Sequence, residues 1–337
     1  MNKEGIRNNR MRSVLHSKIF TLAIVFIALV ILFSIWSSAV GSQFFKLTTF
    51  RNILSALVLS SFITIGAGAL LIGGQIDLSA AAIGAFSGMV LAAAIKGWGM
   101  PWYIGIIIAL VLCAVFGAVN ATMVSVFRFP SFIATLAMMS MAKGLMYLFS
   151  SLGNKGLATN ISFLNKPIAW IGAGSVGPIP FNVIVMVVFF IVYGILIGRT
   201  KLGMKIMLLG GNPVAANLAG IQSRKMTYFL FINGAVLGGV SGIFNTAQLQ
   251  QGSILALANN QFTGLTAAIL GGISFVGGSG GMGGAFLGLL ILQTFQIGMG
   301  VVRFNQFWVG VFSGILLIVA LAVDFFAQMR RNKSFSM

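Results

Sequence analysis

Asp77 is one of three acidic residues in the 337-residue chain, and it lies in the segment 73–79 between two apolar runs. An ionisable side chain inside a membrane region is costly and is usually retained for a function. The pair Gly73-Gly74 favours a break between helices, where Gln75, Asp77 and Ser79 could face a polar solute. Asp77 could also cap the helix that follows, because Asp is a favoured N-cap residue. The segment therefore predicts a polar element of a solute path, a helix cap, or both.

Further amide side chains lie inside apolar runs. Asn245 and Gln248 are three positions apart and would share one face of a helix, and Asn120 lies in an earlier run. Such amides can hydrogen-bond sugar hydroxyls, although they also join membrane helices to one another. We expect the substrate path to include Gln75, Asp77, Ser79, Asn120, Asn245 and Gln248.

Lys143 is a second charged side chain within an apolar run. It could snorkel toward the membrane surface, or it could pair with Asp77 and neutralise it. The sequence leaves both possibilities open.

The chain lacks the side chains that an enzyme or a metal site would need. Glu4, Asp77 and Asp324 are its only acidic residues, and His16 and Cys113 are its only histidine and cysteine. No Gly-x-x-x-x-Gly-Lys-Ser/Thr phosphate loop occurs, so any energy from ATP would have to come through a partner. We therefore predict no catalytic residue, no metal site and no cofactor, and expect a transport subunit rather than an enzyme.

Composition indicates a polytopic membrane protein. Hydrophobic residues make up 58% of the chain and charged residues only 7%, against about 25% charged residues in soluble domains. The net charge of +18 is explained by orientation in the bilayer and by anionic headgroups. No nucleic-acid partner is expected, because the basic residues are scattered between apolar runs and form no continuous patch.

The apolar runs predict an all-α fold of about ten transmembrane helices, at about 20 residues a crossing. The first run is too long for the core of a cleaved signal peptide and is expected to remain as a helix. The eighth run is the shortest. The expected spans are Ile19–Val40, Ile53–Ile72, Ser79–Ile95, Trp102–Phe127, Ser131–Ser150, Phe181–Gly198, Met226–Leu249, Phe262–Val276, Gly283–Val302 and Phe307–Phe326.

Ten crossings put both termini on one side of the membrane, and the distribution of basic residues indicates which side that is. Fourteen Lys and Arg residues fall on the side of the termini and six on the other, which makes the shared side cytoplasmic. The predicted organisation is a basic cytoplasmic tail (1–18), one transmembrane domain (19–328) and a second cytoplasmic tail (329–337).

Two connections are long enough to carry function. The outer loop 151–180 contains the apolar pieces 161–164 and 168–171, which suggest short helices at the membrane interface with Trp170 as an anchor. In the inner loop 199–225, Asn212 suits an N-cap, Pro213 the first helical position and Gly220 the helix end. A short capped helix on the cytoplasmic face favours a docking site for another protein over a plain connector.

Three elements together resemble the membrane permease of ribose-type sugar ABC importers. They are Gly-Gly-x-Ile-Asp-Leu-Ser at 73–79, Gly-Asn-x-x-Ala-Ala-x-Leu-Ala-Gly-Ile at 211–221, and Leu-Gly-Gly-Ile-Ser at 270–274 with the glycine run 277–281. The resemblance covers nearly the whole chain. It implies a multi-pass permease of the bacterial plasma (inner) membrane, used as a pair and served by an external sugar-binding protein and a cytoplasmic ABC ATPase. It also implies that the ATPase is coupled through Gly211, Asn212, Pro213, Ala215, Ala216, Leu218, Gly220 and Ile221.

The chain departs from the family pattern at two places. Ala80-Ala81 follows Asp-Leu-Ser where family members generally have Val-Gly, and Pro213-Val214 stands where an acidic residue often precedes the two alanines. These changes leave open which solute is carried and whether the second permease is identical or homologous. An ion- or proton-coupled carrier and a structural membrane scaffold are the alternatives, although a carrier would usually need several buried carboxylates or histidines.

Overall fold

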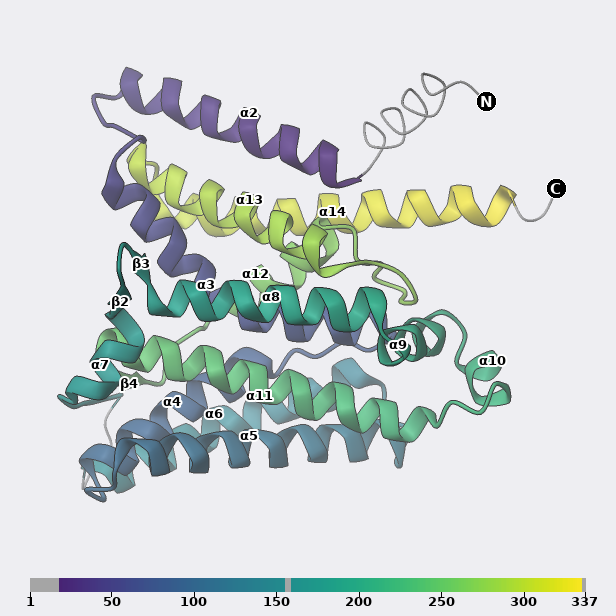
Figure 1. The fold of residues 1–337 in the computed structure, drawn as a ribbon, viewed down its shortest axis with the longest axis horizontal. Coiled ribbons are helices and arrows are strands. Elements are labelled where there is room, and N and C mark those ends of the chain that lie inside the picture. The colour runs from purple at the N-terminus through teal and green to yellow at the C-terminus, as the bar shows by residue number, and fades with distance from the viewer. Residues whose placement is uncertain (1–17, 155–158, 335–337) are drawn as a thin grey trace.

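The computed structural model describes residues 18–154 and 159–334, which form a bundle of helices (Figure 1). The predicted basic tail up to residue 17 and Lys155 lie outside the described residues. The helices are α2 (Lys18–Ala39), α3 (Leu47–Ile72), α4 (Ala80–Lys96), α5 (Trp102–Ser125), α6 (Ser131–Asn154), α7 (Lys166–Ala173), α8 (Phe181–Arg199), α9 (Lys201–Gly211), α10 (Pro213–Leu218), α11 (Ser223–Leu249), α12 (Asn260–Leu270), α13 (Met282–Val301) and α14 (Gln306–Ser334).

The all-α membrane architecture is confirmed, because seven of the described helices are long and apolar enough to cross a membrane. The expected eighth span, Phe262–Val276, is instead the 11-residue helix α12 followed by irregular backbone. Eleven residues rise about 17 Å, roughly half of a ~30 Å hydrocarbon core. The glycine-rich segment after Leu270 carries no charged side chain but does not continue the helix, so hydropathy alone overestimated the length of the helix.

Most helices run along the long axis of the bundle (Figure 1). The short helix α10 lies at one end, called here the α10 end, and α7 with the strands lies at the other, called the α7 end. The start of α2 and the end of α14 both point toward the α10 end.

Helix α11 lies inside the bundle against α3, α4 and α5. Glycines allow its close approach to α4: a Cβ on Gly242 would overlap the carbonyl oxygen of Gly84, and one on Gly238 would overlap that of Ala80. Gly284 and Gly288 are packed in the same way against α12. Glycine at these positions therefore allows close helix packing.

The loop 151–180 contains one of its two expected short helices. Asn165 caps α7, because its side chain accepts a hydrogen bond from the amide of Ile168 at 3.1 Å. The other apolar piece is not a helix. It belongs to strand β1 (Asn160–Ser162), which pairs antiparallel with β4 (Gln251–Ser253) beyond the end of α11. A second small sheet joins β2 (Ser175–Val176) and β3 (Ile179–Pro180).

Candidate functional site

The break between α3 and α4 is organised by Asp77. Its Oδ1 accepts hydrogen bonds from the amide of Ser79 at 2.7 Å and from the Ser79 hydroxyl at 2.6 Å. Asn120 on α5 donates to the same hydroxyl at 3.0 Å. Asp77, Ser79 and Asn120 are all buried, so three of the predicted site residues form one hydrogen-bonded chain inside the protein.

Side chains from two neighbouring helices hold the backbone of the break. The amide of Ile76 donates to the hydroxyl of Ser131, and the amide of Leu78 donates to that of Thr135, each at 3.1 Å. Gln261 on α12 bonds the backbone on both sides of Ser79. Non-helical backbone inside a membrane protein requires such internal partners, and here α6 and α12 supply them.

The arrangement bears on the two roles predicted for Asp77. A carboxylate that accepts from the amide two positions ahead forms an Asx turn, and the N-cap residue of α4, Ser79, has no side-chain cap bond to the helix. The other oxygen, Oδ2, is buried and has no hydrogen-bond partner among the described residues. Asp77 therefore holds the turn before α4, while its role in a solute path stays a prediction.

Lys143 forms no ion pair with Asp77 in the described part of the chain. Its side chain is exposed on α6 and borders a cavity of about 330 Å³, together with Leu78, Tyr147 and Gln261. Asp77 is only 2% exposed and is already bonded to Ser79. The suggested neutralising pair is therefore not part of this structure.

The remaining predicted path residues lie elsewhere. Gln75 borders a cavity of about 470 Å³ at the α10 end, beside Arg224 and Ser125. Asn245 is buried in α11, and Gln248, near the end of that helix, accepts from the hydroxyl of Ser55 at 3.3 Å. The structure thus separates the six predicted residues into a central chain, an end cavity and the far end of α11.

A more concentrated group of amides lines a cavity that the sequence did not reveal, called here the amide cavity. It has a volume of about 540 Å³ and lies between α3, α12 and α13. Its polar residues are Asn52, Asn259, Asn260, Thr263, Gln293 and Gln296. Ser60 on α3 ties two of them together, because it accepts from Asn260 and from Gln293 at 2.8 Å each.

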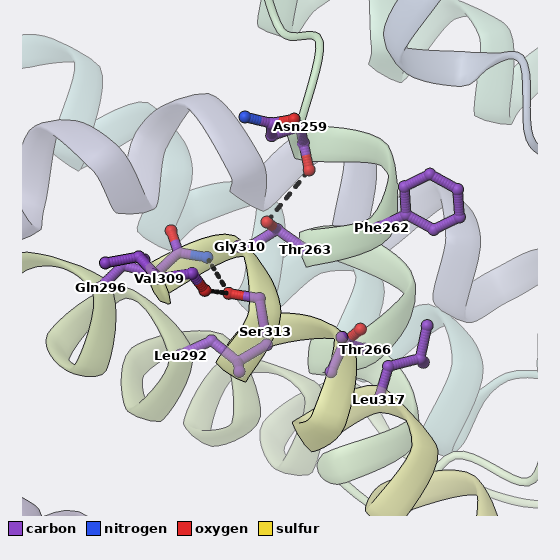
Figure 2. Close-up of a pocket in the computed structure, with 11 residues that line it drawn as sticks. Asn259, Phe262, Thr263, Thr266, Leu292, Gln296, Val309, Gly310, Ser313 and Leu317 are labelled. Atoms are coloured by element: carbon purple, nitrogen blue, oxygen red, sulfur yellow. Dashed lines mark hydrogen bonds between the residues drawn. The ribbon is translucent and has the colours of Figure 1, made fainter. Parts of the chain in front are cut away.

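The amide cavity continues into a second cavity of about 440 Å³ beside α14, with which it shares Asn259, Thr263 and Gln296 (Figure 2). Gln296 reaches across to the hydroxyl of Ser313 at 3.4 Å. A Cβ on Gly310 or Gly314 would meet open space, because these two glycines border the cavity. Phe262 borders this second cavity and also the one that contains Lys143.

Part of this group could have been found from the sequence. Gln293 and Gln296 are three positions apart within a predicted span, which is the spacing that marked Asn245 and Gln248. Asn259 and Asn260 precede the predicted span Phe262–Val276, and no local sequence pattern marks them.

The predicted short helix of the inner loop is confirmed as α10. Asn212 caps it by accepting from the amide of Ala215 at 3.0 Å, Pro213 is at its start, and Gly220 has a positive φ of 79° after its end. Val214 is 70% exposed and Leu218 is 85% exposed. Two apolar side chains held outward on a rigid helix form a surface suited to binding another protein.

Comparisons with known proteins agree with the resemblance. The ribose import permease protein RbsC of Escherichia coli (strain K12) is 29% identical over 300 residues, covering 88% of this chain and 92% of the relative. RbsC of Bacillus subtilis (strain 168) is 29% identical over 289 residues, covering 85% and 88%. The L-arabinose ABC transporter permease protein AraH of Azospirillum brasilense is 29% identical over 260 residues, covering 77% and 74%. No solved structure matches the chain.

A family model described as the permease component of the branched-chain amino acid transport system matches residues 47–321, from the start of α3 into α14. The match includes the segments 73–79 and 270–281 and the helix α10. The protein therefore belongs to this family of transport-system permease components.

Proposed function

We propose that the protein is the membrane permease of an ATP-driven ABC importer for a monosaccharide or a related polar solute, and that the amide cavity is part of the solute path. The assignment of the solute path rests on the amide cavity. Five amide side chains and a threonine converge on about 540 Å³, within the range of about 300–1,000 Å³ typical of small-molecule sites. Amides can both donate to and accept from sugar hydroxyls. Relatives named for ribose and L-arabinose import support a sugar as cargo.

The amide side chains of the cavity differ in whether they already hydrogen-bond to the protein. The side chains of Asn52 and Asn259 make no hydrogen bond with the described residues, whereas Asn260 and Gln293 are held by Ser60. Fixed and free amides together would orient a polar ligand without a charged group. No carboxylate lines this cavity, which also argues against a path for a coupling cation.

The partners follow from what the chain lacks and from the exposed helix. A cytoplasmic ABC ATPase would dock on α10, an external binding protein would deliver the solute, and a second permease, identical or homologous, would complete the path. The ATPase is the component that uses ATP, and the permease needs no cofactor of its own. The protein itself is a multi-pass protein of the bacterial inner membrane.

Ten crossings with both termini in the cytoplasm remain the best topology. The start of α2 and the end of α14 lie toward the α10 end, as an even number of crossings requires (Figure 1). Helix α12 would contribute its crossing together with the irregular segment 271–281 that follows it. Positive charges near α10, including Arg199, Lys201 and Lys205, favour the cytoplasmic assignment of that end.

Uptake by reconstituted vesicles tests the proposal. The permease is co-expressed with a candidate ABC ATPase and a candidate sugar-binding protein, and uptake of labelled ribose and L-arabinose is measured with ATP, without ATP, and under an ion gradient alone. We expect uptake only with ATP and the binding protein. Uptake driven by the gradient through the permease alone would instead establish a secondary carrier.

A further inference from the structure

Three glycine turns from distant parts of the chain meet at the α10 end. They are Gly73-Gly74 after α3, Gly210-Gly211 at the end of α9, and Gly277-Gly278 between α12 and α13. The amide of Gly278 donates to the carbonyl oxygen of Ile72, the last residue of α3, at 2.8 Å. The turns pack backbone against backbone, and together they are called here the glycine junction.

At Gly210 and Gly277 the glycine junction has no room for a side chain. A Cβ on Gly210 would overlap the carbonyl oxygen of Ile72 and would lie 2.8 Å from the amide nitrogen of Gly278, in the position of their hydrogen bond. A Cβ on Gly277 would lie 2.7 Å from the carbonyl oxygen of Gly210. Gly74, Gly277 and Gly278 also have φ values of 71°, 107° and 76°, which favour glycine. Because no flexible side chain separates the turns, a shift of one displaces the others.

The three turns belong to the elements that matter for transport. Gly210-Gly211 leads through Asn212 directly into α10. Gly73-Gly74 ends α3, and Gly277-Gly278 joins α12 to α13. These three helices are the ones that line the amide cavity, through Asn52 on α3, Asn260 on α12 and Gln293 on α13. The glycine junction thus connects the exposed helix with all three helices that line the cavity.

We propose that the glycine junction transmits movement of α10 to the amide cavity, and that Gly210 is the positioning residue at its centre. The proposal rests on the proposed function, because it requires an ATPase that docks on α10. When the ATPase moves α10, the turn at Gly210 moves the end of α3 and the connection between α12 and α13. The cavity then changes shape at its own helices, without any nucleotide site in the permease.

A matched pair of glycine substitutions tests the junction. In the complete complex with ATPase and binding protein, Gly210→Ala is compared with Gly198→Ala, at a glycine of α8 whose added Cβ would meet no atom within 4 Å. We expect Gly210→Ala to retain the bound ATPase and its ATP hydrolysis but to lower solute uptake per ATP at least tenfold. Gly198→Ala should stay within twofold of the unmodified complex. Equal coupling in the two variants would overturn the proposal.

A measurement on the unmodified complex covers the case in which Gly210→Ala does not fold. Amide hydrogen exchange is compared between the ATP-analogue and ADP states. Peptides containing 72–75, 208–212 and 276–280 should change together, whereas a change confined to 208–218 would overturn the transmission route. If the ATPase stayed fully bound to the Leu218→Glu variant, that result would contradict the proposed docking on α10, whatever the result for Gly210.

Discussion

The side chain of Gln261 closes the break that contains Asp77. Its Nε2 donates to the carbonyl oxygen of Asp77 at 2.7 Å, and its Oε1 accepts from the amide of Ala81 at 2.8 Å. Gln261 is 4% exposed and sits in the first turn of α12, 184 positions from Asp77. A half-length helix from the second part of the chain therefore supplies the partners that the backbone lacks between α3 and α4.

Replacing this amide should destabilise the fold. Gln261→Leu would leave a buried carbonyl and a buried N–H without partners, at about 1–3 kcal/mol for each group. We expect a clear drop in the thermal unfolding midpoint of the detergent-purified protein. Gln248→Leu is the control, because the Gln248 side chain makes one hydrogen bond with the described residues, accepting from the hydroxyl of Ser55 at 3.3 Å, and is partly exposed. Similar drops in both variants would contradict the closing role of Gln261.

Two substitutions separate the role of Asp77 in the turn before α4 from contact with solute. Asp77→Asn keeps an oxygen that can accept from Ser79, so we expect thermal stability and uptake to stay near those of the unmodified protein. Asp77→Ala removes both hydrogen bonds to Ser79 and leaves a buried amide without that partner, which should cost about 1–3 kcal/mol. Loss of uptake in Asp77→Asn with an unchanged unfolding midpoint would show that the carboxylate itself acts in the path.

The local elements were predictable from sequence because their causes are local. Asn212, Pro213 and Gly220 carry the cap, the first turn and the end of α10 within nine residues, and the structure has all three as expected. Long apolar runs such as the one that forms α6 were placed to within a few residues. These features depend on residues next to one another in the chain.

The site was less predictable because its contacts join distant positions. Ser60 bonds Asn260 and Gln293, which are 200 and 233 positions away, and no local pattern links them. The end of helix α12 at Leu270 was also missed, for a different reason. The segment 271–281 is rich in glycine and contains no charged residue, so a hydropathy window does not register where the helix ends.

The amide cavity makes contrasting predictions for two adjacent asparagines. Asn259→Leu should lower uptake at least severalfold with little change in the unfolding midpoint, because its side chain makes no hydrogen bond with the described residues. Asn260→Leu should lower both, because its amide donates to the hydroxyl of Ser60 at 2.8 Å. Uptake and thermal unfolding are measured on the same preparations. Normal uptake by Asn259→Leu would argue against a path through this cavity.

Lys143 and Asp77 should behave as independent residues. The structure has no ion pair between them, so the effects of Lys143→Met and Asp77→Asn on the free energy of unfolding should add to within about 0.5 kcal/mol. Lys143→Met alone should not reduce stability, since it removes a mid-helix charge rather than a pair. A coupling energy above 1 kcal/mol in the double-mutant cycle would restore the pairing that the sequence suggested.

The exposed face of α10 predicts where the ATPase binds. Leu218 is 85% exposed, so Leu218→Glu should leave the unfolding midpoint of the permease unchanged. The same change would place a charge in an apolar interface and should abolish co-purification of the ATPase and ATP-driven uptake together. Leu255→Glu is the matched control: Leu255 is 75% exposed in the segment between β4 and α12, remote from α10 in the sequence and in the fold. Because that control adds the same charge without touching α10, it should keep the ATPase bound, and loss of the ATPase from both variants would show that added surface charge, not α10, decides the interaction.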